Sequence, residues 1–584
     1  MWTIKRPAPA EDIKRVSATY NITEYMAQIL LNKGEENIKD LISLTPLHNG
    51  WDLLNMPKCA KRICDAITKK EKIRVCGDMD VDGITSTVIV LLGLREAGAD
   101  IDYDIPHRVN DGYGMNVRMV KEALKDGISL IITVDNGIAQ TEAIEYANKN
   151  GIEVVVTDHH EVPFNEDENG NKVYKLPPTP YIIDQKQPGE TYPFRDICGA
   201  MIVYKLVTCI YDIMRVKQGP GVRNLVELVA LGTVCDIMPL IGENRTIVKY
   251  GLEAMKSTTF PGLKKLMELS DISADKLSTY HFGFILGPCL NATGRLDSAK
   301  LGVELLLAED GEEITKIAEE CKELNEERKK MTENGEKASL EIIEKNGLDM
   351  VIVLYVPGCS PSVAGIVAGR IKEQFNHPTI VFGESPTDKN MLKGSGRSIK
   401  AYNMFGEITK HKDLLESFGG HEMAAGLSIR KDKFDEFKKA LNDDCSLTDK
   451  DFEINVVVDV RVPLHMITEK LVNEIAILEP FGEGNPKPVI AQSKVRIKKA
   501  SYMGSNNQYL RFTFDAGSNR YVNGVYFGDS GKLKEFYTDK YGENAWEDML
   551  AGKKNPIEMT FTYEPSVNEW NGNKTIQAVV KRYT

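Results

Sequence analysis

Residues 72–83 read KIRVCGDMDVDG, a short apolar run that ends in a glycine and three aspartates. An apolar run of this length with β-branched residues predicts a buried β-strand with an acidic loop at its end. The pattern of apolar run, acidic loop and amphipathic helical stretch then repeats to about residue 161, which is typical of a βαβ series. We therefore expect an α/β domain built on a mostly parallel, doubly wound sheet.

Three strands of this sheet are predicted directly, and each is followed by acidic or histidine side chains. The apolar runs are Ile73–Cys76, Leu130–Val134 and Val154–Thr157, with a helical pattern at Thr141–Asn150. The side chains that follow them are Asp78, Asp80, Asp82, Asp135, Asp158, His159 and His160. Because the carboxyl ends of parallel strands meet at one edge of a sheet, we expect these side chains to converge.

Carboxylates gathered at one edge repel one another unless a cation lies between them. Carboxylate and imidazole ligands favour Mn²⁺ or Mg²⁺ over softer metals, and such a set can hold two ions about 4 Å apart. Any single aspartate here could instead be a turn or N-cap residue. The occurrence of Gly77-Asp-Met-Asp-Val-Asp-Gly83, Val134-Asp-Asn-Gly137 and Thr157-Asp-His-His160 at successive strand ends favours a two-metal site, for which phosphoester hydrolysis is the expected reaction class.

Composition and charge narrow the function classes. The 584 residues are 42% hydrophobic and 27% charged, which predicts three to four globular domains. No run approaches the roughly 18 apolar residues of a membrane span, so we expect no membrane role and a cytoplasmic location. The ten cysteines are scattered without a Cys-x-x-Cys pair, which argues against a cysteine zinc site. A net charge of -12 argues against coating nucleic acid by bulk electrostatics, so any nucleic-acid binding needs a local basic channel.

The acidic motifs resemble the DHH phosphoesterase superfamily, whose name-giving motif stands here as Asp158-His159-His160. Asp236, in Gly232-Thr-Val-Cys-Asp-Ile-Met-Pro239, is similar to the fourth acidic motif of that superfamily. The resemblance implies that His160 contacts the phosphate and aids proton transfer, and that Asp78 belongs to the catalytic set. It also implies a ligand set for two Mn²⁺ or Mg²⁺ ions, in which Asp135 is the bridge: Asp80, Asp82, Asp135, His159 and Asp236.

Three further segments offer an arginine to an anion. The first combines it with a glycine-bracketed aromatic residue, a composition that also suits a plain turn, and the other two place it beside glycine or small residues. The three segments are Pro106-His-Arg-Val-Asn-Asp-Gly-Tyr-Gly114, Asn291-Ala-Thr-Gly-Arg-Leu296 and Gly394-Ser-Gly-Arg-Ser398. In Phe418–Gly426, His421 stands at a glycine turn that we expect to enter a helix of small residues. The segments around Gly394 and His421, with Gly365-Ile-Val-Ala-Gly-Arg370, resemble the DHHA1 domain, which supplies substrate contacts in this superfamily.

The chain as far as Phe481-Gly-Glu-Gly-Asn-Pro-Lys-Pro488 resembles the RecJ family. In that family this segment joins the DHHA1 domain to an OB-like barrel. Alternating apolar and polar residues after about residue 451 also predict a small β barrel. Its Tyr502, Tyr509, Arg511 and Phe514 suit stacking on bases, although strand aromatics are more often core residues. By resemblance, the residues that hold the 5′ end and phosphates are Arg108, Asn291, Arg295, Ser395, Arg397 and His421, with His421 near the scissile group.

We expect five parts in the chain. Ile314, Ile317, Cys321 and Leu324 recur at spacings of three and four, which predicts one long connecting helix over Glu309–Asn346. The expected parts are an N-terminal extension packed on the DHH domain (1–70), the DHH domain (71–305), the connecting helix (306–348), a smaller α/β DHHA1 domain (349–448) and an OB-like barrel (449–584).

The function implied is a metal-dependent 5′ to 3′ exonuclease that digests single-stranded DNA to mononucleotides in recombination and repair. One alternative is a phosphodiesterase for short oligonucleotides or cyclic dinucleotides, which the barrel disfavours. Another is a non-catalytic scaffold that binds a strand or partners, which the complete ligand set disfavours. We expect a monomer that cooperates with a helicase and a single-strand-binding protein, without a membrane partner.

Overall fold

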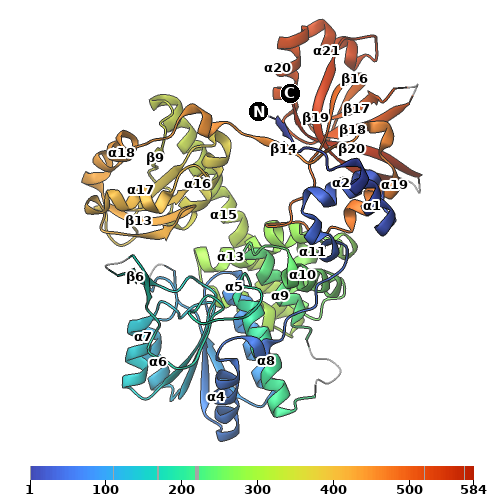
Figure 1. Ribbon diagram of the computed structural model, residues 1–584. Coiled ribbons are helices and arrows are strands. Elements are labelled where there is room, and N and C mark those ends of the chain that lie inside the picture. The colour runs from blue at the N-terminus through green and yellow to red at the C-terminus, as the bar shows by residue number, and fades with distance from the viewer. Residues whose placement is uncertain (1, 109–110, 168–169, 218–222, 518–519, 571–572) are drawn as a thin grey trace. The chain divides into compact units, whose positions relative to one another are not determined.

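The computed structural model describes residues 2–108, 111–167, 170–217, 223–517, 520–570 and 573–584 (Figure 1). The chain forms two compact units, one of residues Pro46–Ile454 and one that joins Met1–Thr45 to Asn455–Thr584. The expectation that residues 1–70 pack together on the DHH domain is therefore wrong up to Thr45. Helices α1 (Ala10–Tyr20) and α2 (Glu24–Asn32) share a hydrophobic core with the C-terminal residues, because their apolar faces pack there.

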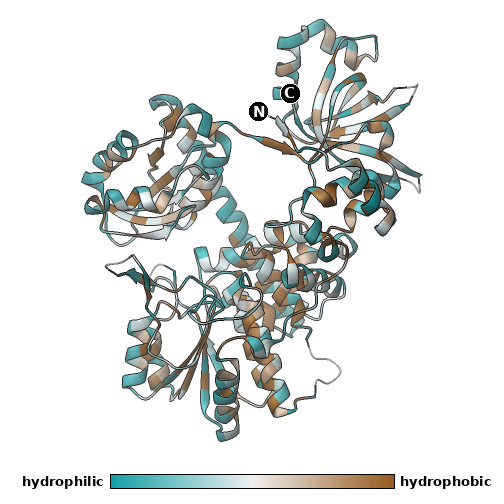
Figure 2. Ribbon diagram, viewed as in Figure 1, coloured by the Kyte–Doolittle hydropathy of each residue, from teal (hydrophilic) through white to brown (hydrophobic). Residues whose placement is uncertain are grey.

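A five-stranded parallel sheet forms the first domain of the larger unit, in the order β3-β2-β4-β5-β8. The three predicted strands are confirmed and lie side by side, whereas β3 and β8 escaped prediction because one is polar and the other very short. Apolar residues cover both faces of the sheet, with α5 and α8 on one face and α6 and α7 on the other (Figures 1 and 2). The strands are β2 (Lys72–Cys76), β3 (Asp100–Asp104), β4 (Leu130–Val134), β5 (Glu153–Thr157) and β8 (Ile182–Ile183).

Helices surround this sheet and lead out of the domain. Those on its faces are α4 (Met56–Lys69), α5 (Val81–Glu96), α6 (Val117–Lys125), α7 (Thr141–Lys149) and α8 (Gly199–Met214). Those that follow are α9 (Val226–Cys235), α10 (Gly242–Met255), α11 (Pro261–Leu269), α12 (Thr279–His281), α13 (Gly287–Leu296), α14 (Lys300–Leu307) and α15 (Gly311–Asn346). Helix α15 confirms the predicted long helix, and its predicted residues Ile314, Ile317 and Cys321 are buried. Within the described ranges no helix is both long and apolar enough to cross a membrane.

A smaller sheet of order β12-β13-β11-β10-β9 forms the second domain of this unit. One prediction is wrong here, because His421 ends strand β12 rather than entering a helix. The glycine-rich segment around Gly394 is strand β11. Glycine is needed in β11 because a Cβ at Gly394 would lie 2.6 Å from the Phe382 ring. The elements are β9 (Ile352–Tyr355), α16 (Pro361–Phe375), β10 (Thr379–Glu384), β11 (Met391–Arg397), α17 (Met404–Lys410), β12 (Ser417–His421), β13 (Ala424–Arg430) and α18 (Phe434–Asp443).

The other unit is built on a six-stranded sheet of order β15-β16-β17-β18-β20-β19, which an additional pairing between β16 and β19 closes into a barrel. This confirms the predicted barrel. Phe514 is fully buried and stacked on Phe561, so it is a core residue and not a base-stacking one. The elements are β14 (Val456–Val458), β15 (Val460–Arg461), α19 (Glu469–Ala476), β16 (Ile490–Met503), β17 (Tyr509–Asp515), β18 (Tyr521–Tyr526), α20 (Ser530–Tyr541), α21 (Glu543–Leu550), β19 (Glu558–Trp570) and β20 (Asn573–Tyr583).

Candidate active site

The loop after β2 is fixed by two helix N-termini. The Asp80 carboxylate caps α5, accepting hydrogen bonds from the backbone N–H groups of Asp82 and Gly83 at 3.0 and 3.1 Å. The Asp82 carboxylate accepts from the N–H groups of Gly199 (2.6 Å) and Ala200 (3.0 Å), which begin α8. Asp80 thus has the capping role that was the structural alternative, yet its carboxylate also lies in a potential metal-binding group. Burial and repulsion by Asp80 raise the pKa of Asp82 to about 6, although the N–H groups of Gly199 and Ala200 lower it.

The loop after β4 is tied to the strands on either side of it. Asp135 has a φ of 61°, a left-handed conformation that aspartate tolerates better than most residues. Its N–H donates to the Thr157 carbonyl at the end of β5 (3.0 Å). The Asn136 amide donates to the Cys76 carbonyl at the end of β2 (3.0 Å). The three strand ends therefore hold Asp135 at the centre of the acidic edge.

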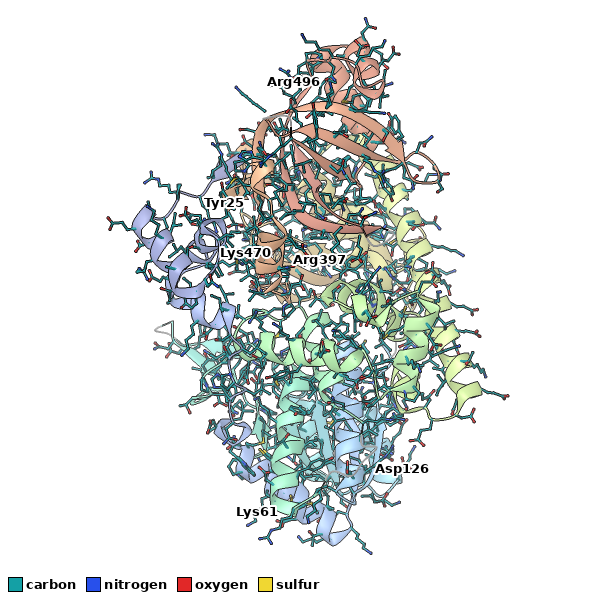
Figure 3. All side chains as sticks on the ribbon, turned by 90° about the vertical axis from the view of Figure 1, so that its right-hand side faces the viewer. Tyr25, Lys61, Asp126, Arg397, Lys470 and Arg496 are labelled. Carbon is teal, nitrogen blue, oxygen red and sulfur yellow. The ribbon has the colours of Figure 1, made fainter. Side chains whose placement is uncertain are left out.

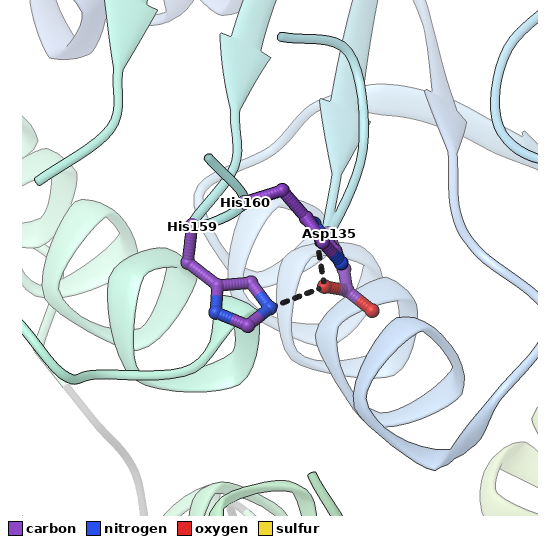
Figure 4. Close-up of side chains that lie close together, drawn as sticks. All are labelled: Asp135, His159 and His160. Atoms are coloured by element: carbon purple, nitrogen blue, oxygen red, sulfur yellow. Dashed lines mark ion pairs between the residues drawn. The ribbon is translucent and has the colours of Figure 1, made fainter. Parts of the chain in front are cut away.

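His159 reaches the same point from β5 (Figure 4). Its Nε2 lies 3.0 Å from the Asp135 carboxylate, 3.5 Å from that of Asp236 and 3.8 Å from that of Asp82. Asp236 follows the last residue of α9, so a carboxylate far along the sequence joins the strand-end residues. The structure thus brings together all five ligands that the resemblance implied.

The ligand atoms divide into two separate groups of three. Asp78, Asp80 and Asp135 form one group, and Asp82, His159 and Asp236 form the other, with the ligand atoms in each group within 4.8 Å of one another. Asp78, predicted as catalytic, therefore lies among potential metal ligands. A third combination joins Asp135 to His159 and His160, so Asp135 occupies the central position expected of a bridge.

The chemistry of these groups fits divalent cations. Among the described residues, buried oxygens of Asp78, Asp135 and Asp236 and both ring nitrogens of His159 have no hydrogen-bond partner. Burial and repulsion by neighbouring carboxylates raise the pKa of Asp135 and Asp236 well above the ordinary value. Burial lowers the pKa of His159 to about 3, which leaves a neutral imidazole. Buried polar atoms need partners, and a neutral imidazole among crowded carboxylates is a natural metal ligand.

His160 is held apart from this set by Asp158. Its Nδ1 lies 2.7 Å from Asp158 Oδ1, so that carboxylate fixes the ring, and Nδ1 is 3.9 Å from the Asp135 carboxylate. Although burial lowers the pKa of His160, the hydrogen bond to Asp158 raises it overall to about 9. The Tyr113 hydroxyl lies 3.2 Å from the His160 ring nitrogens and donates to the Asp135 carbonyl (3.1 Å). His160 can therefore act as a positioned, protonated group at the site.

Helix α13 packs on the acidic loop and brings the next predicted residues with it. The Asn291 side-chain oxygen accepts from the N–H of Val81 (3.2 Å). A Cβ at Gly294 would lie 2.3 Å from the Met79 carbonyl, so glycine is required for this close approach. Arg108 reaches the same helix, where its Nε donates to the Gly294 carbonyl at 3.4 Å. Val109 and Asn110, in the same predicted segment, lie outside the described residues.

Arginines gather beside this helix. Arg295 donates to the Ser362 carbonyl (3.1 Å) and Arg397, labelled in Figure 3, donates to the Gly396 carbonyl (2.8 Å). Ser395 lies two residues before Arg397 on β11 and, like it, faces Gly365 of α16. Burial lowers the pKa of Arg295 to about 10, with further lowering by Arg108, Arg328 and Arg397. In the part of the chain that is described, these four arginines donate to backbone carbonyls or to Asn325 and form no ion pair, so their charge is available to an anion.

Sequence reasoning missed some of these residues and placed one elsewhere. Arg328 lies on α15, where its guanidinium donates to Asn325 (2.6 Å), and nothing in a charged helical segment marks it out. Asp158 was named only as part of its motif, although the spacing to His160 could have suggested an orienting role. His421 is exposed, with its Nδ1 accepting from the Met423 N–H (3.3 Å), and no described contact brings it to the acidic edge. Its role near the scissile group stays a prediction.

Three family models match successive parts of the chain. The DHH family N-terminal domain matches residues 72–233, the DHHA1 domain matches residues 349–446, and the RecJ OB domain matches residues 458–582. The matched regions contain the aspartates and histidines that follow β2, β4 and β5, the strand that carries Arg397 and the closed barrel, whereas Asp236 lies just beyond the DHH match. All three domains that the sequence suggested are thus found in order.

Known proteins match the chain over most of its length. It is 34% identical to the single-stranded-DNA-specific exonuclease RecJ of Bacillus subtilis, over 99% of this chain and 70% of that protein. It is 31% identical to RecJ of Escherichia coli, over 91% of this chain and 90% of that protein. The crystal structure of Thermus thermophilus RecJ in complex with Mn²⁺ matches with a TM-score of 0.81 at 25% identity, covering 100% of this chain and 79% of that one. The chain belongs to the RecJ family of single-stranded-DNA-specific exonucleases.

Proposed function

We propose that this chain hydrolyses single-stranded DNA from its 5′ end to mononucleotides, using two Mn²⁺ or Mg²⁺ ions, in recombination and repair. The observation that carries the proposal is the pair of three-residue ligand groups with an arginine cluster gathered beside helix α13. The names of the relatives and the metal of the Thermus structure support the same substrate and the same ions.

The ligand groups have separate tasks in this proposal. Asp78, Asp80 and Asp135 would hold one ion, while Asp82, His159 and Asp236 would hold the other. When bound, the two ions activate a water and stabilise negative charge on the phosphoryl oxygens. Because His160 is protonated and fixed by Asp158, it can donate a hydrogen bond to a phosphate oxygen or a proton to the leaving oxygen.

The arginine cluster sets the position of the strand. Arg108, Arg295 and Arg397, with Ser395, bind phosphate oxygens next to the metal ions, since guanidinium forks match phosphate geometry. Asn291 holds the acidic loop through Val81 and so positions the metal ligands relative to the arginines. A strand end with its terminal phosphate satisfies several unpaired arginines at once, which supports exonuclease rather than endonuclease action. We further propose a monomer that acts with a helicase and a single-strand-binding protein.

The test uses one oligonucleotide labelled in turn at its 5′ and 3′ ends, incubated with Mn²⁺ and the wild-type protein. We expect rapid release of the 5′ label as a mononucleotide and stepwise shortening of the 3′-labelled strand. Asp135→Asn should abolish both. Asp100→Asn is the matched control, because Asp100 begins β3 and therefore lies at the opposite edge of the same sheet.

The competing functions predict different products. If a cyclic dinucleotide is cut while the long strand survives, the site belongs to a small-substrate phosphodiesterase. If neither substrate is cut in Mn²⁺ or Mg²⁺ although the strand is bound, the chain is a binding scaffold. Early loss of the 3′ label with an intact 5′ end would reverse the proposed polarity.

A further inference from the structure

Helix α9 ends directly before the proposed ligand Asp236, and the end has an unusual conformation. The Ile237 N–H donates to the Val234 carbonyl (3.2 Å) and the Met238 N–H donates to the Thr233 carbonyl (3.1 Å). These two bonds define a helix end that normally requires a left-handed residue, most often glycine, at the position of Ile237. Ile237 has a φ of 57° there, which is unfavourable for a β-branched side chain.

Folding does not account for an isoleucine at this position. The side chain is 70% exposed, so its burial returns little of the cost of the left-handed backbone. A glycine would make the same two hydrogen bonds without strain. Strained residues with no packing role occur mostly at functional sites, and Ile237 directly follows the ligand Asp236.

Two exposed aromatic residues lie on the segment that packs against this helix end. Tyr280 and Phe284 are 59% and 70% exposed, and their rings stack with centroids 5.2 Å apart and an angle of 23° between planes. They belong to α12 and the π-helical turn η4 (Phe282–Leu286), a rare conformation that is frequent at functional sites.

The segment is anchored on the last turn of α9. The Cys235 thiol donates to the Phe282 carbonyl (3.5 Å), and Phe282 itself is fully buried. A Cβ at Gly283 would lie 3.8 Å from the Val234 side chain. The stacked rings are thus carried by a rigid segment beside the last turn of α9. We call Ile237, Tyr280 and Phe284 the apolar platform.

We propose that the apolar platform binds unpaired nucleobases of the strand whose phosphate lies at Asp236. Every base has an apolar π-face, and exposed aromatic rings bind such faces without reading sequence. Ile237 directly follows Asp236, and the segment that carries Tyr280 and Phe284 is anchored on the same helix end. The bases that the platform takes are therefore those next to the scissile phosphate. This inference rests on the proposed exonuclease function and names the part of the substrate that the platform contacts.

The first test separates folding from binding at Ile237. Ile237→Gly should leave the melting temperature unchanged or raised, since strain is relieved, while KM for a single-stranded oligonucleotide rises about fivefold or more. The matched control is Ile213→Ala, an exposed isoleucine near the far end of α8, which should change neither quantity. A lower melting temperature with a parallel loss of activity would assign Ile237 to folding and overturn the inference. An unchanged KM would overturn it too.

The second test asks whether the partner of the platform is a base. An oligonucleotide whose first few 5′ nucleotides are abasic should have a raised KM with the wild-type protein. Phe284→Ala should raise KM for the normal strand and leave KM for the abasic strand unchanged, because the contact is already absent. If Phe284→Ala raised KM for the abasic strand by the same factor as for the normal strand, the two effects would be independent and base contact would be ruled out.

The same assay keeps this inference apart from the proposed function. If the wild-type protein digests neither strand, the proposed function itself has failed. An exposed apolar surface could also bind a second copy of the chain. Sedimentation of the wild type and of Phe284→Ala measures whether the protein is a dimer and whether the variant loses it. A dimer that the variant loses, with KM for DNA unchanged, would assign the platform to a second copy of the chain.

Discussion

The acidic edge of the parallel sheet and the arginine cluster around α13 both gather like charges, but they are built differently. The aspartates follow strand ends and are fixed by backbone N–H groups, such as those of Gly199 and Ala200 on Asp82. The arginines come from separate elements and are fixed by backbone carbonyls, such as those of Ser362 and Gly396. The first arrangement is complete only with cations and the second only with an anion, so together they describe a metal-assisted reaction on a phosphate.

The largest effect is expected at the acidic edge when the central carboxylate, Asp135, is neutralised. Asp135→Asn should lower kcat by about 10⁴-fold, as removal of a central catalytic group does. The metal-free variant should melt at a higher temperature than the metal-free wild type, because burial and carboxylate repulsion disfavour the charged Asp135. Calorimetry should also show that Mn²⁺ stabilises the variant less than the wild type, because Asp82, His159 and Asp236 remain. Equal stabilisation of both proteins by Mn²⁺ would contradict the central position of Asp135.

A smaller loss is expected when the fixed imidazole is removed. His160→Gln should lower kcat by about 10²-fold or more, since a positioned proton donor contributes that much. Mn²⁺ binding, measured by titration calorimetry, should stay close to that of the wild type because His159 keeps its place. Asp158→Asn serves as the companion variant, since it keeps His160 but loses its charged partner. If Mn²⁺ affinity fell as much as kcat, His160 would be a ligand instead.

Substitution of Arg295 tests the role of the arginine cluster. A hydrogen bond to a charged group contributes about 1.5–3 kcal/mol, so Arg295→Met should lower kcat/KM by roughly 10- to 100-fold. The change should fall on KM, and the advantage of a 5′-phosphorylated strand over a 5′-hydroxyl strand should shrink. The variant should fold at least as stably as the wild type, because burial and neighbouring arginines disfavour its charge. Arg430→Met, at an exposed site, is the control.

The smallest effect is expected at the edge of the cluster. Arg328→Met should raise KM by only a few-fold, since Arg328 already donates to Asn325 and contributes mainly long-range charge. The difference in KM between Arg328→Met and the wild type should become smaller at high salt, because screening weakens distant charges first. A KM effect as large as that of Arg295→Met would place Arg328 in direct contact with the phosphate.

The two regions also differ in how far sequence could predict them. The aspartates at strand ends can be predicted from the sequence, because a strand has a fixed period and parallel strands end at one edge of the sheet. Asp236, Arg295 and Arg397 were found by resemblance, since no local pattern links α9, α13 and β11. His421 was placed in the wrong element because Gly and Ala suit both a tight strand and a turn, and only the pairing of β12 with β13 decides between them.

The sequence by itself determined the parallel sheet, the long helix α15, the barrel and the acidic edge, because these follow from short-range periodicity and from the rule that parallel strands end together. Tertiary structure alone decided that residues up to Thr45 join the C-terminal unit, that Phe514 is core, and that Arg328 joins the arginine cluster. It also revealed Ile237 as strained and exposed. Packing between distant segments sets all of these features, and the local pattern of residues carries no record of which segments will meet.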